Sequence, residues 1–156
     1  MNRRGFLWIG AGALAAAAGT AGGWLLAGAP AGAAPRLLVH RSPSCGCCGA
    51  WIEHMAANGF DVEVEMLDDL GPVKTRLGVP ATVEACHTAT VGGYVVEGHV
   101  PAADVHRLLA ERPAATGLAV PGMPIGSPGM EQGSTREPYR VILFGQHRQS
   151  TWSTYS

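Results

Sequence analysis

The sequence predicts an α/β fold that follows an N-terminal export signal. Three observations support this fold class: short apolar runs typical of strands, segments of helical periodicity between them, and a two-glycine connection typical of a tight hairpin. About 120 residues remain after the signal, which is enough for one compact domain with a real core and too few for two.

The first 33 residues are interpreted as the export signal. Arg3 and Arg4 precede an uncharged run rich in alanine and glycine, and small residues typical of a cleavage site place the mature start near Ala34. The opening NRRGFLW resembles the twin-arginine signal, although an ordinary secretory leader also fits. We therefore expect a periplasmic protein. A retained membrane anchor is the alternative, because the run is long enough to span a bilayer.

Composition argues against nucleic acid as a partner. The mature part carries nine basic residues against 12 acidic ones, and Lys74 is its only lysine. No basic run could follow a phosphate backbone. We expect a monomer whose partners are metal ions and, in the periplasm, copper efflux or redox proteins.

The first predicted elements are a strand and a helix. RLLVHR, at residues 36–41, is a short apolar run that leads into the turn-forming SPS. Trp51, Ile52, Met55 and Ala56 then recur at helical spacing, and the pair at residues 58–59 supplies a helix stop. Three cysteines lie between, so they are expected at the N-terminus of this helix.

A second strand and helix follow, and then a hairpin. Residues 60–67 alternate as in a half-buried strand, and Asp68 or Asp69 can cap a short helix that Gly78 closes. HTATV and YVVEG, joined by a Gly-Gly pair, predict the hairpin, and Pro101 opens a helix that Pro113 ends. The order β-α-β-α-β-β-α, with a CxxC spacing at the first helix, is typical of a thioredoxin-like domain over residues 34–113.

Residues 114–156 are expected to form a C-terminal extension that packs on the same domain. Its first part, 115–137, is rich in glycine and proline and shows no usable periodicity, and a loop of that length is usually functional or disordered. YRVILFG and RQSTWSTY predict a terminal hairpin that turns at residues 145–146.

The cysteines raise two chemical alternatives. Cys45 and Cys48 could form a redox-active CxxC pair, with thiolates favoured by the helix N-terminus. Cys47 would then compete for every mixed disulfide. A metal site uses all three thiols, since soft thiolates select soft ions and Cu(I) is the natural soft ion for an exported protein. Two structural disulfides fit poorly, because Cys47 and Cys48 are adjacent and a domain of this size does not need staples to fold.

Two further parts of the chain are expected to join this site. In a thioredoxin-like fold the strand that follows Cys86 begins against the CxxC loop, which would bring the fourth thiol to the other three. That position usually carries a proline, whereas this chain has His87, which weakens the disulfide-exchange interpretation. The loop over 115–137 supplies Met123 and Met130, whose thioethers suit Cu(I). The alternative is that both methionines only fill gaps in packing.

SPSCGCCGAWIEHM, LGVPATVEACHTATVGGYVVEGHVPAADVHRLL and GLAVPGMPIGSPGME together resemble the CopG-type copper-resistance proteins, a metal-binding family catalogued as domain of unknown function 411. The resemblance implies a periplasmic thioredoxin-like domain whose C-terminal extension helps to bind a multinuclear, cysteine-bridged copper cluster. It assigns the cluster to Cys45, Cys47, Cys48 and Cys86, and the extension to the segment with Met123 and Met130. It also implies interconversion of Cu(I) and Cu(II).

The histidines are not predicted to be direct ligands. His87 could tune the site through a hydrogen bond or could be exposed, since neighbours in a strand point to opposite faces. His54 is expected in solvent or core, and His99 could be a local cap near a helix start. The remaining histidines show no ligand spacing: His40, His106 and His147.

Three functions therefore remain open at the level of sequence. The first is a copper protein with redox turnover, which would make it a copper oxidoreductase. The second is a thiol–disulfide oxidoreductase that uses Cys45 and Cys48, and the third is a passive copper chaperone. No catalytic triad, phosphate loop or paired-acid motif is present. Glu63 and Glu65 are interpreted as residues on the solvent-exposed face of a strand.

Overall fold

The computed structural model describes residues 32–146 and 148–156. The predicted export signal lies almost wholly outside the described residues, and so does His147. Within the described part, no helix is long and apolar enough to span a membrane.

Seven strands and three α-helices make up the described chain, which confirms the mixed α/β class. In chain order they are β1 (Arg36–Arg41), α1 (Gly46–Ala57), β2 (Asp61–Met66), α2 (Gly71–Leu77), a 3₁₀ turn η1 (Ala81–Val83), β3 (His87–Val91), β4 (Tyr94–Gly98), α3 (Ala102–Glu111), β5 (Gly117–Val120), β6 (Tyr139–Phe144) and β7 (Gln149–Tyr155).

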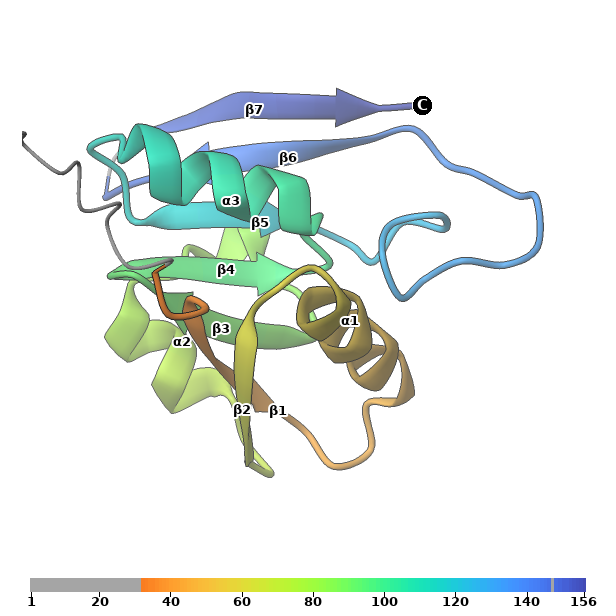
Figure 1. The fold of residues 1–156 in the computed structure, drawn as a ribbon, viewed down its shortest axis with the longest axis horizontal. Helices are drawn as coiled ribbons and strands as arrows, with labels where there is room; N and C mark the ends of the chain where they lie inside the picture. The colour runs from red at the N-terminus through yellow and green to blue at the C-terminus, as the bar shows by residue number, and fades with distance from the viewer. Residues whose placement is uncertain (1–31, 147) are drawn as a thin grey trace, which may run out of the picture. The chain divides into compact units, whose positions relative to one another are not determined.

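The strands form one sheet in the order β2-β1-β3-β4-β5-β6-β7 (Figure 1). The pairs β1–β2 and β4–β5 are parallel and the other pairs are antiparallel. The residues after 113 thus continue the same sheet that the earlier strands begin. They place β5, β6 and β7 beside β4.

Helices cover both faces of the sheet, and each face has its own core. Trp51 and Met55 of α1 and Val105 and Leu108 of α3 belong to the larger cluster, together with alternate residues of the strands. The smaller cluster lies on the other face near α2 and includes Val95 and Phe144. Figure 1 shows α1 and α3 on the near face, with α2 on the far one.

Local sequence signals account for the ends of most elements. Gly78 closes α2 in the left-handed conformation, with φ of 70°, and the β3–β4 turn has positive φ at both Gly92 and Gly93. The N-cap of α2 is Leu70 and not Asp68 or Asp69, and no side chain caps the helix; Asp69 instead accepts a local hydrogen bond from the Gly71 N–H at 2.8 Å. The predicted strand, helix and hairpin positions are confirmed here.

Two expectations about the elements are wrong. Strand β2 is not half-buried, because Val64 is 38 % and Met66 55 % exposed at this edge of the sheet. The stretch 115–137 is not without regular structure, because it contains β5. This strand is buried along its whole length between β4 and β6, so it lacks the polar–apolar alternation that reveals half-buried strands.

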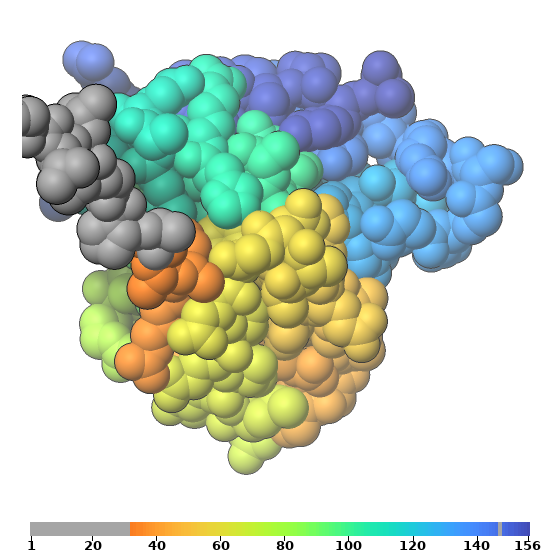
Figure 2. Space-filling model, in the orientation of Figure 1, coloured from red at the N-terminus to blue at the C-terminus, as the bar shows by residue number. Residues whose placement is uncertain are grey.

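The segment that joins β5 to β6 lies against α1. Figure 2 shows it, in light blue, next to the yellow and orange surface of α1. An added Cβ at Gly129 would lie only 2.6 Å from the backbone nitrogen of Trp51 and 3.1 Å from the Cys47 carbonyl oxygen. Glycine therefore allows this segment to pack directly on the first turns of the helix, where the cysteines are.

Candidate metal centre

Three cysteines lie at the N-terminus of α1, as the sequence predicts. Cys45 is the N-cap in an extended conformation, and no side chain caps the helix. The first turn carries no acidic residue, so no side chain of this turn neutralises the positive end of the helix dipole. Cys48 is fully buried, whereas Cys45 and Cys47 are half-buried.

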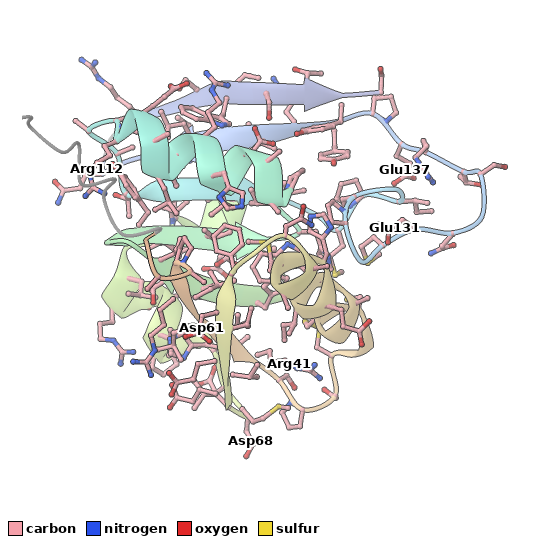
Figure 3. The ribbon with its side chains drawn as sticks, in the orientation of Figure 1. Arg41, Asp61, Asp68, Arg112, Glu131 and Glu137 are labelled. Carbon is pink, nitrogen blue, oxygen red and sulfur yellow. A yellow bond between two sulfur atoms is a disulfide. The ribbon has the colours of Figure 1, made fainter. Side chains whose placement is uncertain are left out.

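The turn that carries these cysteines is supported by Arg41 at the end of β1, labelled in Figure 3. Its guanidinium donates to the Ser42 carbonyl at 3.2 Å and reaches the Pro43 carbonyl at 3.5 Å. The Cys45 N–H in turn donates to the Ser42 carbonyl at 3.1 Å. The loop between β1 and α1 is therefore held from both the strand and the helix.

The fourth cysteine joins the other three. Cys86 lies just before β3, and its Sγ is 3.7 Å from that of Cys48, while the Sγ atoms of Cys45 and Cys47 are 3.6 Å apart. Ligand atoms of all four residues lie within 4.8 Å of one another. In this structure Cys45 and Cys48 form a disulfide, and Cys47 and Cys86 are free.

These spacings suit a shared metal ion. Two thiolates bound at about 2.3 Å to one tetrahedral ion lie about 3.8 Å apart. The separations of 3.6 Å for Cys45–Cys47 and 3.7 Å for Cys48–Cys86 are close to that value, and Cys45 and Cys48 become thiolates once their disulfide is reduced. The donor set consists of soft sulfur atoms, which prefer Cu(I), Zn²⁺ or related soft ions.

Two histidines lie against the fourth cysteine. The sequence raised this possibility for His87 but missed it for His99, which was expected to be a local cap. The Sγ of Cys86 is 3.3 Å from Nδ1 of His87 and 3.2 Å from Nε2 of His99, and these three residues form a second group with metal-ligand spacing. Both histidines are fully buried. His87 escapes the strand rule because Cys86 lies outside β3, where the backbone is irregular.

One contact assigns a role to each nitrogen of His99. Its Nδ1 lies 2.8 Å from the Pro128 carbonyl, an acceptor, so Nδ1 carries the proton. Nε2 is then unprotonated, and its lone pair faces the Cys86 sulfur. For His87, Nε2 is buried without a hydrogen-bond partner among the described residues, and its ring packs on Trp51 with centroids 4.4 Å apart.

Burial keeps these groups neutral while no ion is bound. Burial, and next the charge of Cys47, raise the pKa of Cys86 to about 12. Burial, followed by the neighbouring charges of His99 and Lys74, lowers the pKa of His87 to about 3, and burial also lowers the pKa of His99. Metal binding must therefore displace the Cys86 proton, whereas both imidazoles already have the neutral form of a ligand.

The two methionines differ in position. Met123 is 42 % exposed, with φ of 52°, and Met130 is half-buried. Met130 directly follows Gly129, which packs on α1, and Pro128, which binds His99. The structure thus brings the segment with Met130 to the site.

Comparison with known proteins places the chain in a family. Residues 83–130 match the family model described as protein of unknown function, DUF411. Two solved structures named copper resistance protein CopG, form 2 and form 1, are each 46 % identical to this chain with a TM-score of 0.75. The matches cover 79 % and 78 % of this chain, and 99 % and 98 % of those chains. No curated protein matches.

The fold and the site define an α/β protein with a cysteine-rich cluster able to bind a metal ion. More particularly, the chain belongs to the DUF411 family, together with the copper resistance protein CopG.

Proposed function

We propose that the protein is a periplasmic copper protein that holds several copper ions bridged by Cys45, Cys47, Cys48 and Cys86. The observation that carries this proposal is the meeting of four sulfur atoms from two distant parts of the chain, at spacings that fit a shared ion. Clustered thiolates, two of them adjacent in sequence, suit bridging between ions. The names of the solved relatives support copper as the metal.

The proposal includes the organisation of the chain. We infer an export signal over residues 1–33, a thioredoxin-like domain over 34–113 and an extension over 114–156. The order of the first seven predicted elements and the position of CxxC at the start of α1 support the thioredoxin-like assignment. We further propose that the protein is monomeric.

The extension would add soft ligands and close the site. The thioethers of Met123 and Met130 would bind Cu(I), which accepts neutral sulfur ligands. His99 would be a nitrogen ligand or a hydrogen-bond partner of the Cys86 sulfur, held in place by Pro128. Mixed sulfur and nitrogen donors suit both Cu(I) and Cu(II), and so support interconversion of the two states with one electron passed to or from a redox partner.

The count of copper ions per chain tests this proposal. Protein reduced and loaded with Cu(I) without oxygen, then freed of excess metal, should hold more than one ion per chain by elemental analysis. Cys47→Ser should lower that count. A single ion or none in the unaltered chain would reject the cluster.

The methionines need a separate test. The double variant Met123→Leu, Met130→Leu keeps side-chain volume and removes both sulfurs. We expect this variant to retain copper less well against a Cu(I) chelator. Met66→Leu is the control, because the exposed Met66 thioether lies on β2, and copper retention should not change in it. Equal retention in all three proteins would assign Met123 and Met130 to packing alone.

The disulfide between Cys45 and Cys48 favours a second candidate, a thiol–disulfide oxidoreductase. One observation weighs against it. Free thiols lie close to the disulfide, with Cys86 at 3.7 Å from Cys48 and Cys47 at 3.6 Å from Cys45, and both would compete in exchange. If Cys47→Ser leaves copper binding unchanged while Cys48→Ser abolishes insulin reduction, this second function replaces the first.

A further inference from the structure

Lys74, the only lysine of the chain, is buried in α2 on the face of the sheet opposite α1. Its Nζ has three hydrogen-bond partners, which are the Ala85 carbonyl at 3.0 Å, Thr88 Oγ1 at 3.0 Å and the carboxylate of Glu97. An ammonium group has three donors, so every one is used. Such burial is unusual, because lysine is almost never fully buried in folded proteins.

Glu97 completes the same network from β4. It is fully buried, its Oε1 accepts from the Ala85 N–H at 2.7 Å, and its Oε2 accepts from the Thr88 hydroxyl at 2.6 Å. The ion pair therefore holds the peptide groups on both sides of Ala85 and the side chain of Thr88. These two residues flank Cys86 and His87 in sequence.

The ladders of the sheet end just before Cys86. The β3–β4 register stops at Thr88 and Glu97 and the β1–β3 register stops at Arg41 and His87, so Cys86 lies beyond the last pair of both. The chain also turns away at Gly98, with φ of 70°, where an added Cβ would lie 2.5 Å from that of Ala85. The network replaces the missing ladder at the point where the fourth thiol must be placed.

Stability alone does not explain such a pair. A buried ion pair costs so much desolvation that well-packed apolar residues of similar volume are often as stable or more so. The pair instead fixes the conformation of the loop, because every donor and acceptor of the network is used. Apolar packing would not fix a loop in this way.

We propose that Lys74 and Glu97 are positioning residues that hold Cys86 against the three cysteines of α1. This inference rests on the proposed function only in taking the four cysteines as one metal site. Neither residue belongs to the groups with metal-ligand spacing, and each acts through the backbone of Ala85 and the side chain of Thr88.

The test uses Cd²⁺, a soft ion that does not change oxidation state, with the full chain reduced and without copper. The intensity of the sulfur-to-cadmium absorption reports how many thiolates bind, and Cys86→Ser supplies the three-thiolate reference. The variant Lys74→Met, Thr88→Val, Glu97→Leu replaces the network by apolar groups. The N–H and carbonyl groups of half-buried Ala85 then lose their side-chain partners and can hydrogen-bond only to water.

We expect the apolar variant to remain folded, to bind Cd²⁺ at least tenfold more weakly and to give the spectrum of Cys86→Ser. Lys74→Met, Glu97→Gln keeps an acceptor for the Ala85 N–H and should recover part of the affinity. Tyr155→Phe, which removes a hydrogen bond far along the chain on β7, controls for a general loss of stability and should leave the spectrum unchanged.

The outcomes separate the two proposals. An apolar variant with unaltered spectrum and affinity overturns the positioning role, and so does a Cys86→Ser spectrum equal to that of the unaltered chain. If the network variants lose the fourth thiolate while the unaltered chain holds only one copper ion, the positioning role stands and the copper cluster fails.

Discussion

At the scale of single residues, Gly129 packs the extension directly on the backbone of Trp51 and Cys47. Its φ is 82°, and the Trp51 nitrogen lies 2.6 Å from where a Cβ would be. Both the conformation and the space exclude a larger residue. Its neighbour Pro128 holds His99, so the fit at Gly129 also fixes an imidazole beside Cys86.

Gly129→Ala is expected to lift this segment off α1. The strained conformation and the clash should lower the free energy of unfolding by about 1–3 kcal/mol and weaken copper retention, because the contact between His99 and Pro128 is lost. Denaturant unfolding and chelator competition measure the two effects. Gly133→Ala is the matched control, because Gly133 has φ of 58° but nothing within 4 Å of an added Cβ. Equal effects from both substitutions would show that strain alone matters.

His54 is a second residue with a testable role. Its Nε2 accepts a hydrogen bond from the Ala102 N–H at 3.1 Å, at the start of α3, so the nitrogen must be unprotonated. Burial lowers the pKa of His54 from its ordinary value of 6.5, and the charge of Glu131 opposes this. The sequence suggested only solvent or core for this residue, whereas the structure gives it a hydrogen-bonding function.

The sign of the pH effect follows from the lowered pKa. Below pH 6.5 the unfolded chain binds a proton that folded His54 resists, so its contribution is present above pH 6.5 and lost as the pH falls. His54→Gln keeps an acceptor at every pH and should make the loss of stability between pH 7 and pH 5 shallower. Urea unfolding of metal-free protein at each pH measures this. Identical profiles for the unaltered chain and His54→Gln would contradict the role.

At the scale of elements, the terminal hairpin is tied to α3 by side chains. Tyr155 of β7 donates to Asp104 Oδ2 at 2.6 Å, and Arg107 lies over the Trp152 ring at 4.0 Å. Asp104 is 4 % exposed, so its carboxylate depends on this partner. Burial, and next the hydrogen bond to Asp104, raise the pKa of Tyr155. The last strand is therefore fixed to the same helix that packs over β5.

Tyr155→Phe should lower the free energy of unfolding by about 1–3 kcal/mol, since it leaves a buried carboxylate without its donor. Tyr139→Phe is the control, because the Tyr139 ring stacks on Tyr155 but its hydroxyl has no hydrogen-bond partner in the described chain. Thermal denaturation compares the two variants. A loss of similar size in both would mean that ring packing, not the hydrogen bond, carries the effect.

Elements also show how far the sequence could be interpreted. Alternation and turn residues sufficed for β1, the β3–β4 hairpin and the terminal hairpin, because each has a local signal. Strand β5 has none, since its burial depends on β6, which comes later in the chain. The approach of His99 to Cys86 was predictable in principle, because the hairpin pairs Thr88 with Glu97 and both residues lie just beyond that last pair.

At the scale of the whole molecule, the proposed copper site joins the two ends of the fold. Cys45 to Cys48 belong to α1 near the start, Cys86 to the middle and Met130 to the extension. The sequence predicted the cysteines that meet and offered Cys45 and Cys48 as a possible CxxC pair, but it could not show the buried Lys74–Glu97 pair. That contact depends on which face of the sheet α2 covers.

Copper loading should therefore stabilise the entire chain. A ligand that binds only the folded state at one hundred times its dissociation constant adds about 2.7 kcal/mol, which corresponds to a rise of several degrees in Tm for a domain of this size. Thermal unfolding of reduced protein with and without Cu(I) measures this. Cys86→Ser, which removes the one thiol that does not come from the start of α1, should show a smaller rise, and an equal rise would place the copper elsewhere.

The bond between Cys45 and Cys48 has a consequence for how much copper such a molecule can take up. A chain in this form must receive two electrons before it can offer four thiols. Uptake is then limited by the supply of reductant in the compartment as well as by the concentration of copper. Two populations with identical affinity would store different amounts of metal, according to how recently each had been reduced.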